Sequence, residues 1–85
     1  MKKYLVIIQD EWNNLYYIGQ YKKLSDSVKD INNFLDVYDV NISTSDLKEY
    51  TSTFGSCFDL DVSSLHEDRD DLNGIMIRGF VLWNM

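Results

Sequence analysis

The stretch "KYLVIIQDEWNNLYYIGQYK", residues 3–22, decides how the chain begins to fold. Residues 3–9 and 15–22 are rich in aliphatic, β-branched and aromatic side chains, which favour β-strands. The residues between them are polar, and Asn13 and Asn14 suit the left-handed backbone of a tight turn. The sequence therefore predicts a β-hairpin with a short loop.

A helix is expected next, at about 26–38. Its apolar residues recur at helical spacing, and they are Val28, Ile31, Leu35 and Tyr38. Ser25 or Ser27 can cap its N-terminus. Asp36 and Asp39 lie near its C-terminus, where negative charge opposes the helix dipole. A local feature that costs stability in this way is typical of a functional position.

A second, shorter helix is expected at 45–53, with Thr44 or Ser45 as its start signal and Gly55 as its stop. From Cys57 the hydrophobic period changes to two, which indicates a strand with one buried and one acidic face. The apolar members of this alternation are Phe58, Leu60 and Val62, and the polar members are Asp59, Asp61 and Ser63.

The run "IMIRGFVLW", residues 75–83, supplies the last strand, and Gly79 interrupts its apolar character. Asn73 and Gly74, just before it, form a pair common in type I′ turns. The order of elements is thus ββααββ over a single domain, residues 1–85. The expected fold class is a two-layer α+β domain, with two helices on one face of a four-stranded, mainly antiparallel sheet.

Charge and cysteine content narrow the classes of function. Fourteen acids against eight bases give the 85 residues a net charge of −6, which repels nucleic acid and anionic membranes. The apolar run at residues 4–8 is too short for a signal peptide or a membrane span. A single cysteine excludes an internal disulfide and favours a reducing compartment. We therefore expect a cytoplasmic protein that binds neither nucleic acid nor membranes directly.

The acidic stretch "HEDRDDLNG", residues 66–74, is the strongest candidate for a metal site. An EF-hand loop needs glycine at its sixth position, and aligning Gly74 there puts Arg69 first and Phe80 twelfth, where acids are required. The calcium-loop interpretation therefore fails. A solvated turn, or part of a negative surface, explains the stretch better, and no metal or other cofactor is expected.

Cys57 and His66 are the sole residues of their kind and hence the one conceivable pair of nucleophile and base. Nine residues of extended chain would separate them by roughly 30 Å. No glycine-rich phosphate loop is present, because the four glycines are scattered singly. We therefore expect no catalytic residue and no enzyme activity.

Acidic residues recur on several expected elements, and an aromatic residue lies in the hairpin loop. Aromatic side chains are favoured at protein interfaces, and arrays of carboxylates attract basic partners. These residues are the expected partner-binding set: Trp12, Asp26, Asp30, Asp36, Asp39, Asp59, Asp61, Glu67, Asp68, Asp70 and Asp71. Excess acid that merely keeps a small protein in solution is the competing explanation.

In size and composition the chain resembles the small acidic inhibitors encoded by phages and mobile elements, including anti-CRISPR and antirestriction proteins. That resemblance implies a binding protein that occupies the basic groove of a nucleic-acid-binding enzyme, such as a nuclease, in place of DNA or RNA. The alternative is a small regulatory or accessory module that pairs strands or aromatic surfaces, with itself as a homodimer or with another protein. A metal-dependent hydrolase using residues 67–71 is the least supported.

Overall fold

The structure is a computed structural model that describes residues 2–52 and 55–83. Its strands are β1 (Lys2–Gln9), β2 (Leu15–Tyr21), β3 (Glu49–Ser52), β4 (Gly55–Asp61) and β5 (Met76–Trp83), and its α-helix is α1 (Leu24–Leu35). Four short 3₁₀ helices join them: η1 (Asp36–Tyr38), η2 (Thr44–Asp46), η3 (Val62–Leu65) and η4 (Asp70–Leu72).

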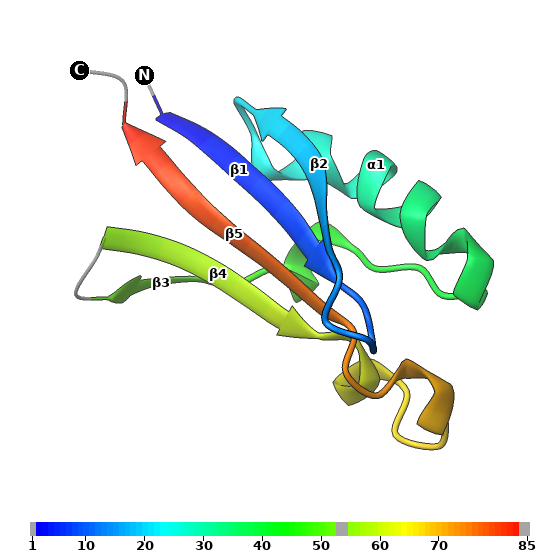
Figure 1. The fold of residues 1–85 in the computed structure, drawn as a ribbon. Coiled ribbons are helices and arrows are strands. Elements are labelled where there is room, and N and C mark those ends of the chain that lie inside the picture. The colour runs from blue at the N-terminus through cyan, green and yellow to red at the C-terminus, as the bar shows by residue number, and fades with distance from the viewer. Residues whose placement is uncertain (1, 53–54, 84–85) are drawn as a thin grey trace.

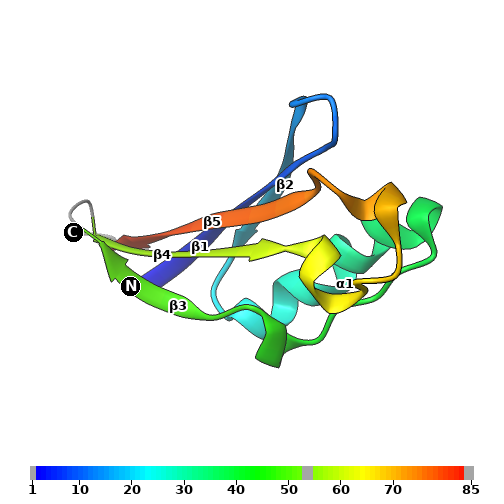
Figure 2. The same cartoon turned by 90° about the horizontal axis from the view of Figure 1, so that it is seen from below.

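The five strands form one antiparallel sheet in the order β2-β1-β5-β4-β3. The last strand of the sequence returns to the centre, between β1 and β4 (Figure 1). This place suits the apolar run of β5, because a central strand has neighbours on both sides, and its residues Ile77, Gly79 and Val81 are buried beneath α1's side of the sheet. Helix α1 covers one side of the sheet (Figure 2). We call the other side the open face.

The expected fold class is wrong in two respects, since the described residues contain five strands instead of four and one α-helix instead of two. The error lies in the segment expected as a helix at 45–53. A capping box between Ser43 and Asp46 does start a helical turn, but η2 ends after three residues. Tyr50 and Thr51 then favour extended backbone, and β3 pairs with β4. Gly55, expected to stop the helix, begins β4 with a φ of 111°.

The hairpin expected at 3–9 and 15–22 is confirmed by the pairing of β1 with β2. Asn13 takes the left-handed conformation that its turn position suggested, with a φ of 67°. The register shifts between Val6 and Ile7, which marks a β-bulge.

Helix α1 and η1 together occupy residues 24–38, close to the helix expected at 26–38. The expected serine cap is wrong, because the N-cap is Lys23, without a side-chain hydrogen bond. Ser27 is instead buried and donates to the carbonyl oxygen of Leu24 at 2.6 Å. Asp39 ends η1 in the left-handed conformation, with a φ of 57°, which aspartate tolerates better than most residues. Asp39 thus has a structural role as well as a charge.

The turn before β5 is also different from the expected type I′. Asn73 has a φ of −62° and a ψ of 131°, and Gly74 has a φ of 89°. The amide of Ile75 donates to the carbonyl of Leu72 at 3.2 Å. These values fit a type II turn, in which glycine at the third position supplies the positive φ.

The hydrophobic core lies between the sheet and α1. Buried side chains of α1 meet alternate residues of β1, β4 and β5, as the period of two requires. Central members of this core are Val6, Ile8, Ile31, Leu35, Phe58 and Ile77. Leu72 and Ile75, which flank the type II turn, are fully buried and anchor the connection from β4 to β5.

Candidate functional site

The loop between β1 and β2 is fixed by a buried carboxylate. The Asp10 carboxylate is 3% exposed and accepts hydrogen bonds from the amides of Trp12 and Asn14, the Asn14 side chain and the Tyr16 hydroxyl, at 2.9 to 3.1 Å. Burial acts to raise the pKa of Asp10, but the hydrogen bonds from Asn14, Tyr16 and Trp12 outweigh it and leave the pKa lowered. The loop is therefore held by a charged anchor, and it presents Trp12 with 73% of its surface exposed.

This loop packs against the segments that follow α1 and η4. The Tyr38 hydroxyl donates to the Glu11 carboxylate at 3.1 Å, and burial, followed by this bond, raises the pKa of Tyr38 to about 12. A Cβ at Gly74 would lie 3.2 Å from the Cα of Glu11. The Trp12 loop is thus supported from two sides by parts of the chain distant in sequence.

Arg69 connects the acidic stretch at 66–74 to the end of η1. Its guanidinium donates to the Asp71 carboxylate at 2.7 Å and to the carbonyl oxygens of Tyr38 at 2.7 Å and Asp39 at 3.3 Å. The hydrogen bond between the Arg69 guanidinium and the Asp71 carboxylate raises the pKa of Arg69 and lowers the pKa of Asp71. Residue 71 is therefore partly neutralised.

These contacts gather part of the expected set at one end of the molecule (Figure 1). We call this region the acidic end, and it consists of Trp12, Asp36, Asp39, Glu67, Asp68, Asp70 and Asp71. All seven side chains are exposed. An aromatic side chain that the sequence places far from the acids thus lies on a loop that packs against the segments carrying them.

The remaining members of the expected set lie elsewhere. Asp26 and Asp30 are on α1, and Asp30 accepts a hydrogen bond from the Tyr21 hydroxyl at 2.7 Å. Asp59 and Asp61 share the open face of β4, as their spacing predicted. The Asp61 carboxylate also has a structural role, because it accepts hydrogen bonds from the amide and the hydroxyl of Ser63 and so caps η3.

The open face carries an apolar surface that the sequence analysis did not identify. Of nine large hydrophobic side chains that are exposed in the described residues, five lie on this face: Leu15, Tyr17, Tyr50, Phe80 and Leu82. Neighbouring residues of a strand point to opposite faces, and both Tyr16 and Tyr17 of β2 are exposed. The grouping of the five required the strand order, which places β2 and β3 at opposite edges of one sheet.

A shallow depression of about 300 Å³ lies on the open face across β3, β4 and β5. Tyr50, Asp59 and Arg78 are among the residues that line it. The Tyr50 hydroxyl donates to Asp59 at 3.2 Å, and its pKa is raised to about 12 by hydrogen bonds to Cys57 and Asp59. This tyrosine is therefore a neutral hydrogen-bond donor at physiological pH.

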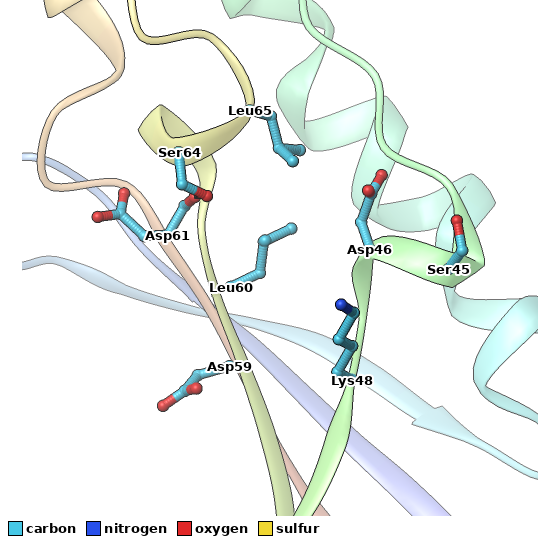
Figure 3. Close-up of a pocket in the computed structure, with 8 residues that line it drawn as sticks. All are labelled: Ser45, Asp46, Lys48, Asp59, Leu60, Asp61, Ser64 and Leu65. Atoms are coloured by element: carbon cyan, nitrogen blue, oxygen red, sulfur yellow. Dashed lines mark hydrogen bonds between the residues drawn. The ribbon is translucent and has the colours of Figure 1, made fainter.

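A second pocket, of about 400 Å³, opens where β4 extends beyond the end of its pairing with β3. Leu60 and Leu65 point into it, and Asp46 and Lys48 lie on the opposite wall (Figure 3). Asp46 is already bonded to the Ser43 amide at 2.8 Å. The pocket combines apolar walls with polar side chains, which include Ser45, Lys48 and Ser64.

The structure places the two residues considered as nucleophile and base on different segments. Cys57 lies within β4, whereas His66 follows η3, beyond the end of that strand. Within residues 2–52 and 55–83, no three His, Cys, Asp or Glu side chains gather closely enough to hold a metal ion.

No family model, curated protein or solved structure matches the chain. In the part of the chain that the structure describes, no helix has the length and apolar character needed to cross a membrane. Any function must therefore be inferred from the two surfaces described above, the acidic end and the open face.

Proposed function

We propose that this chain is a small, non-catalytic binding protein whose acidic end binds a positively charged protein. The observation that carries the proposal is an exposed indole on a fixed loop, supported by the segments that bear six exposed carboxylates. A tryptophan on a fixed loop costs little backbone entropy on binding and is the kind of residue that dominates interface energies. Carboxylates at the same end of the molecule increase the association rate with a basic partner and exclude acidic ones.

The class of partner that suits this chemistry is a nucleic-acid-binding enzyme such as a nuclease, because its groove presents many Arg and Lys side chains to phosphates. Carboxylates of the acidic end would replace the phosphates, and Trp12 would fill an apolar contact beside them. This is inhibition of the anti-CRISPR or antirestriction type. It would act in the cytoplasm, of a host cell if the chain comes from a phage.

The test begins with a pull-down from a bacterial lysate and identification of the bound proteins. Affinity of a recovered partner is then measured for the parent, for Trp12→Ala and for the double variant Asp68→Asn with Asp70→Asn. The matched control is Asp26→Asn with Asp30→Asn, which removes the same charge from α1. We expect at least a tenfold loss for the first two variants and less than a threefold change for the control, and a steep decline with salt for the parent.

Equal effects of the two double variants would show that net charge alone attracts the partner. Unchanged binding by Trp12→Ala and by the Asp68/Asp70 variant would remove the acidic end as the binding surface. If the recovered partner binds no nucleic acid, the inhibitor interpretation is wrong even where the acidic end is the interface.

A further inference from the structure

The open face is a largely apolar surface, and none of the described helices covers it (Figure 2). Its five exposed side chains, Leu15, Tyr17, Tyr50, Phe80 and Leu82, adjoin the half-buried Leu5, Ile7 and Met76. Single exposed hydrophobic residues are ordinary, but a contiguous patch on a folded domain marks an interaction surface.

The size of this face fits a protein interface. Five strands spaced about 4.8 Å apart, with a mean length of about seven residues at 3.3 Å each, cover roughly 500 Å² of plane. The accessible surface of the projecting side chains exceeds this flat projection. A standard interface buries about 800 Å² per partner, so full coverage of the open face provides an interface of that class.

The charges of the open face differ from those of the chain as a whole. Strand register places two cations, Lys3 and Arg78, and two anions, Asp59 and Asp61, on this face. Their formal charges cancel, although the chain carries −6 in total. A basic protein therefore gains little from this face, whereas a largely apolar surface that also carries no net charge matches it.

We propose that the open face binds a second copy of this chain, forming a twofold symmetric dimer of face-to-face sheets. A second copy meets the requirements above, because its open face offers the same apolar area and carries no net charge. The twofold axis lies in the plane between the sheets and perpendicular to the strands, so that the strands of the two copies run in opposite directions.

The position of β5 selects this orientation. β5 is the central strand and Gly79 lies near its midpoint, so complete overlap of the faces centres the axis there. Residue 78 of each copy then lies over residue 80 of the other copy. Arg78 of each copy faces the Phe80 ring of the other, a favourable cation–π arrangement that symmetry makes twice. An axis parallel to the strands would stack Arg78 on itself and bring the acidic ends together.

The experiment is sedimentation equilibrium of the full chain over a series from about 1 μM to about 1 mM, the range that separates weak from moderate association. We expect the parent mass to approach that of a dimer with increasing concentration. Phe80→Ser and Tyr17→Ser should each weaken dimerisation at least tenfold. Both residues are about half exposed, and thermal unfolding verifies that the variants fold.

The matched control is Val37→Ser, which removes an exposed hydrophobic side chain from η1, away from the open face, and should leave the dissociation constant unchanged. A parent that stays monomeric throughout overturns the proposal and leaves the face to a different protein. Dimerisation that survives both Phe80→Ser and Tyr17→Ser overturns it as well. Neither outcome affects the acidic end, whose test uses different residues.

Discussion

Replacing Gly79 with alanine should destabilise the protein, because the Phe58 ring occupies the space that a side chain at residue 79 would fill. The two residues are directly opposite on β5 and β4. A Cβ at residue 79 would lie 1.9, 2.2 and 2.5 Å from three carbon atoms of the ring. Ordinary carbon contacts are about 3.5 to 4.0 Å, so the ring would have to retreat by roughly 1.5 Å.

The ring has little room to retreat. Phe58 is 1% exposed, and its ring packs at a centroid distance of 6.3 Å from that of Tyr4. Overpacking of this kind costs about 1 to 3 kcal/mol and occasionally more. Restricting the unfolded chain by removing a glycine returns about 0.4 to 1 kcal/mol. We expect a net loss of about 2 kcal/mol, which at 4 to 8 °C per kcal/mol lowers the Tm by roughly 10 °C.

Thermal and urea unfolding, followed by circular dichroism, measure this loss. Gly19→Ala is the matched control, because a Cβ there would meet only the far end of the half-buried Tyr21 side chain, 2.8 Å from its hydroxyl oxygen, and not a fully buried ring. Phe58→Leu should partly rescue Gly79→Ala, with a coupling of at least about 1 kcal/mol in a double-mutant cycle. Gly79→Ala within about 0.5 kcal/mol of the parent, or strictly additive effects, would refute the reasoning.

Three further results are expected. Because the pKa of Asp10 is lowered on folding, its carboxylate stabilises the fold above its unfolded pKa of 3.8, and this stabilisation is lost as the pH falls through the folded pKa. The urea midpoint should therefore decline less below pH 4 for Asp10→Asn than for the parent. Calorimetric titration with Ca²⁺ or Mg²⁺ should show no site tighter than about millimolar at residues 67–71, and a saturable micromolar site would contradict this. Cys57→Ser should leave binding at the acidic end intact while lowering stability by on the order of 1 kcal/mol, and lost binding by a folded variant would give the thiol a functional role.

The spacing of hydrophobic residues is enough to predict those helices and strands in which it follows one clear period. The hairpin, the α1 region and the alternation around Phe58 are of this kind, since each has several side chains in phase. The segment at 45–53 is different, because it combines a genuine helix start with a four-residue strand. A strand this short has too few residues to establish a period, and its pairing with β4 determines its conformation.

The candidate sites depended still more on contacts distant in sequence. The acids at 67–71 and those after α1 were identifiable by charge, but their proximity comes from Arg69, whose guanidinium reaches carbonyl oxygens thirty and thirty-one residues away. The packing of the Trp12 loop against the segment after α1 follows from the bond between Glu11 and Tyr38. Side chains that contact backbone carbonyls leave no residue pattern, and such contacts are visible only in the fold.

A net charge of −6 on each copy opposes self-association, and the orientation of the two copies decides how strongly. With strands antiparallel, the acidic ends lie at opposite ends of the dimer, on a molecule whose longest extent is 42 Å. This exceeds a Debye length of about 8 Å several times, so their repulsion is screened at physiological salt. With strands parallel, the acidic ends would be adjacent and the repulsion would remain.

Cross-linking distinguishes these two orientations. In a Cys57→Ser background, antiparallel strands centred on Gly79 place residue 82 of one copy over residue 76 of the other. A mixture of the Leu82→Cys and Met76→Cys variants should therefore form mixed dimers with a short bismaleimide, and neither variant should cross-link efficiently alone. Efficient cross-linking of Leu82→Cys to itself would mean parallel strands, and the charge argument for the orientation would then fail.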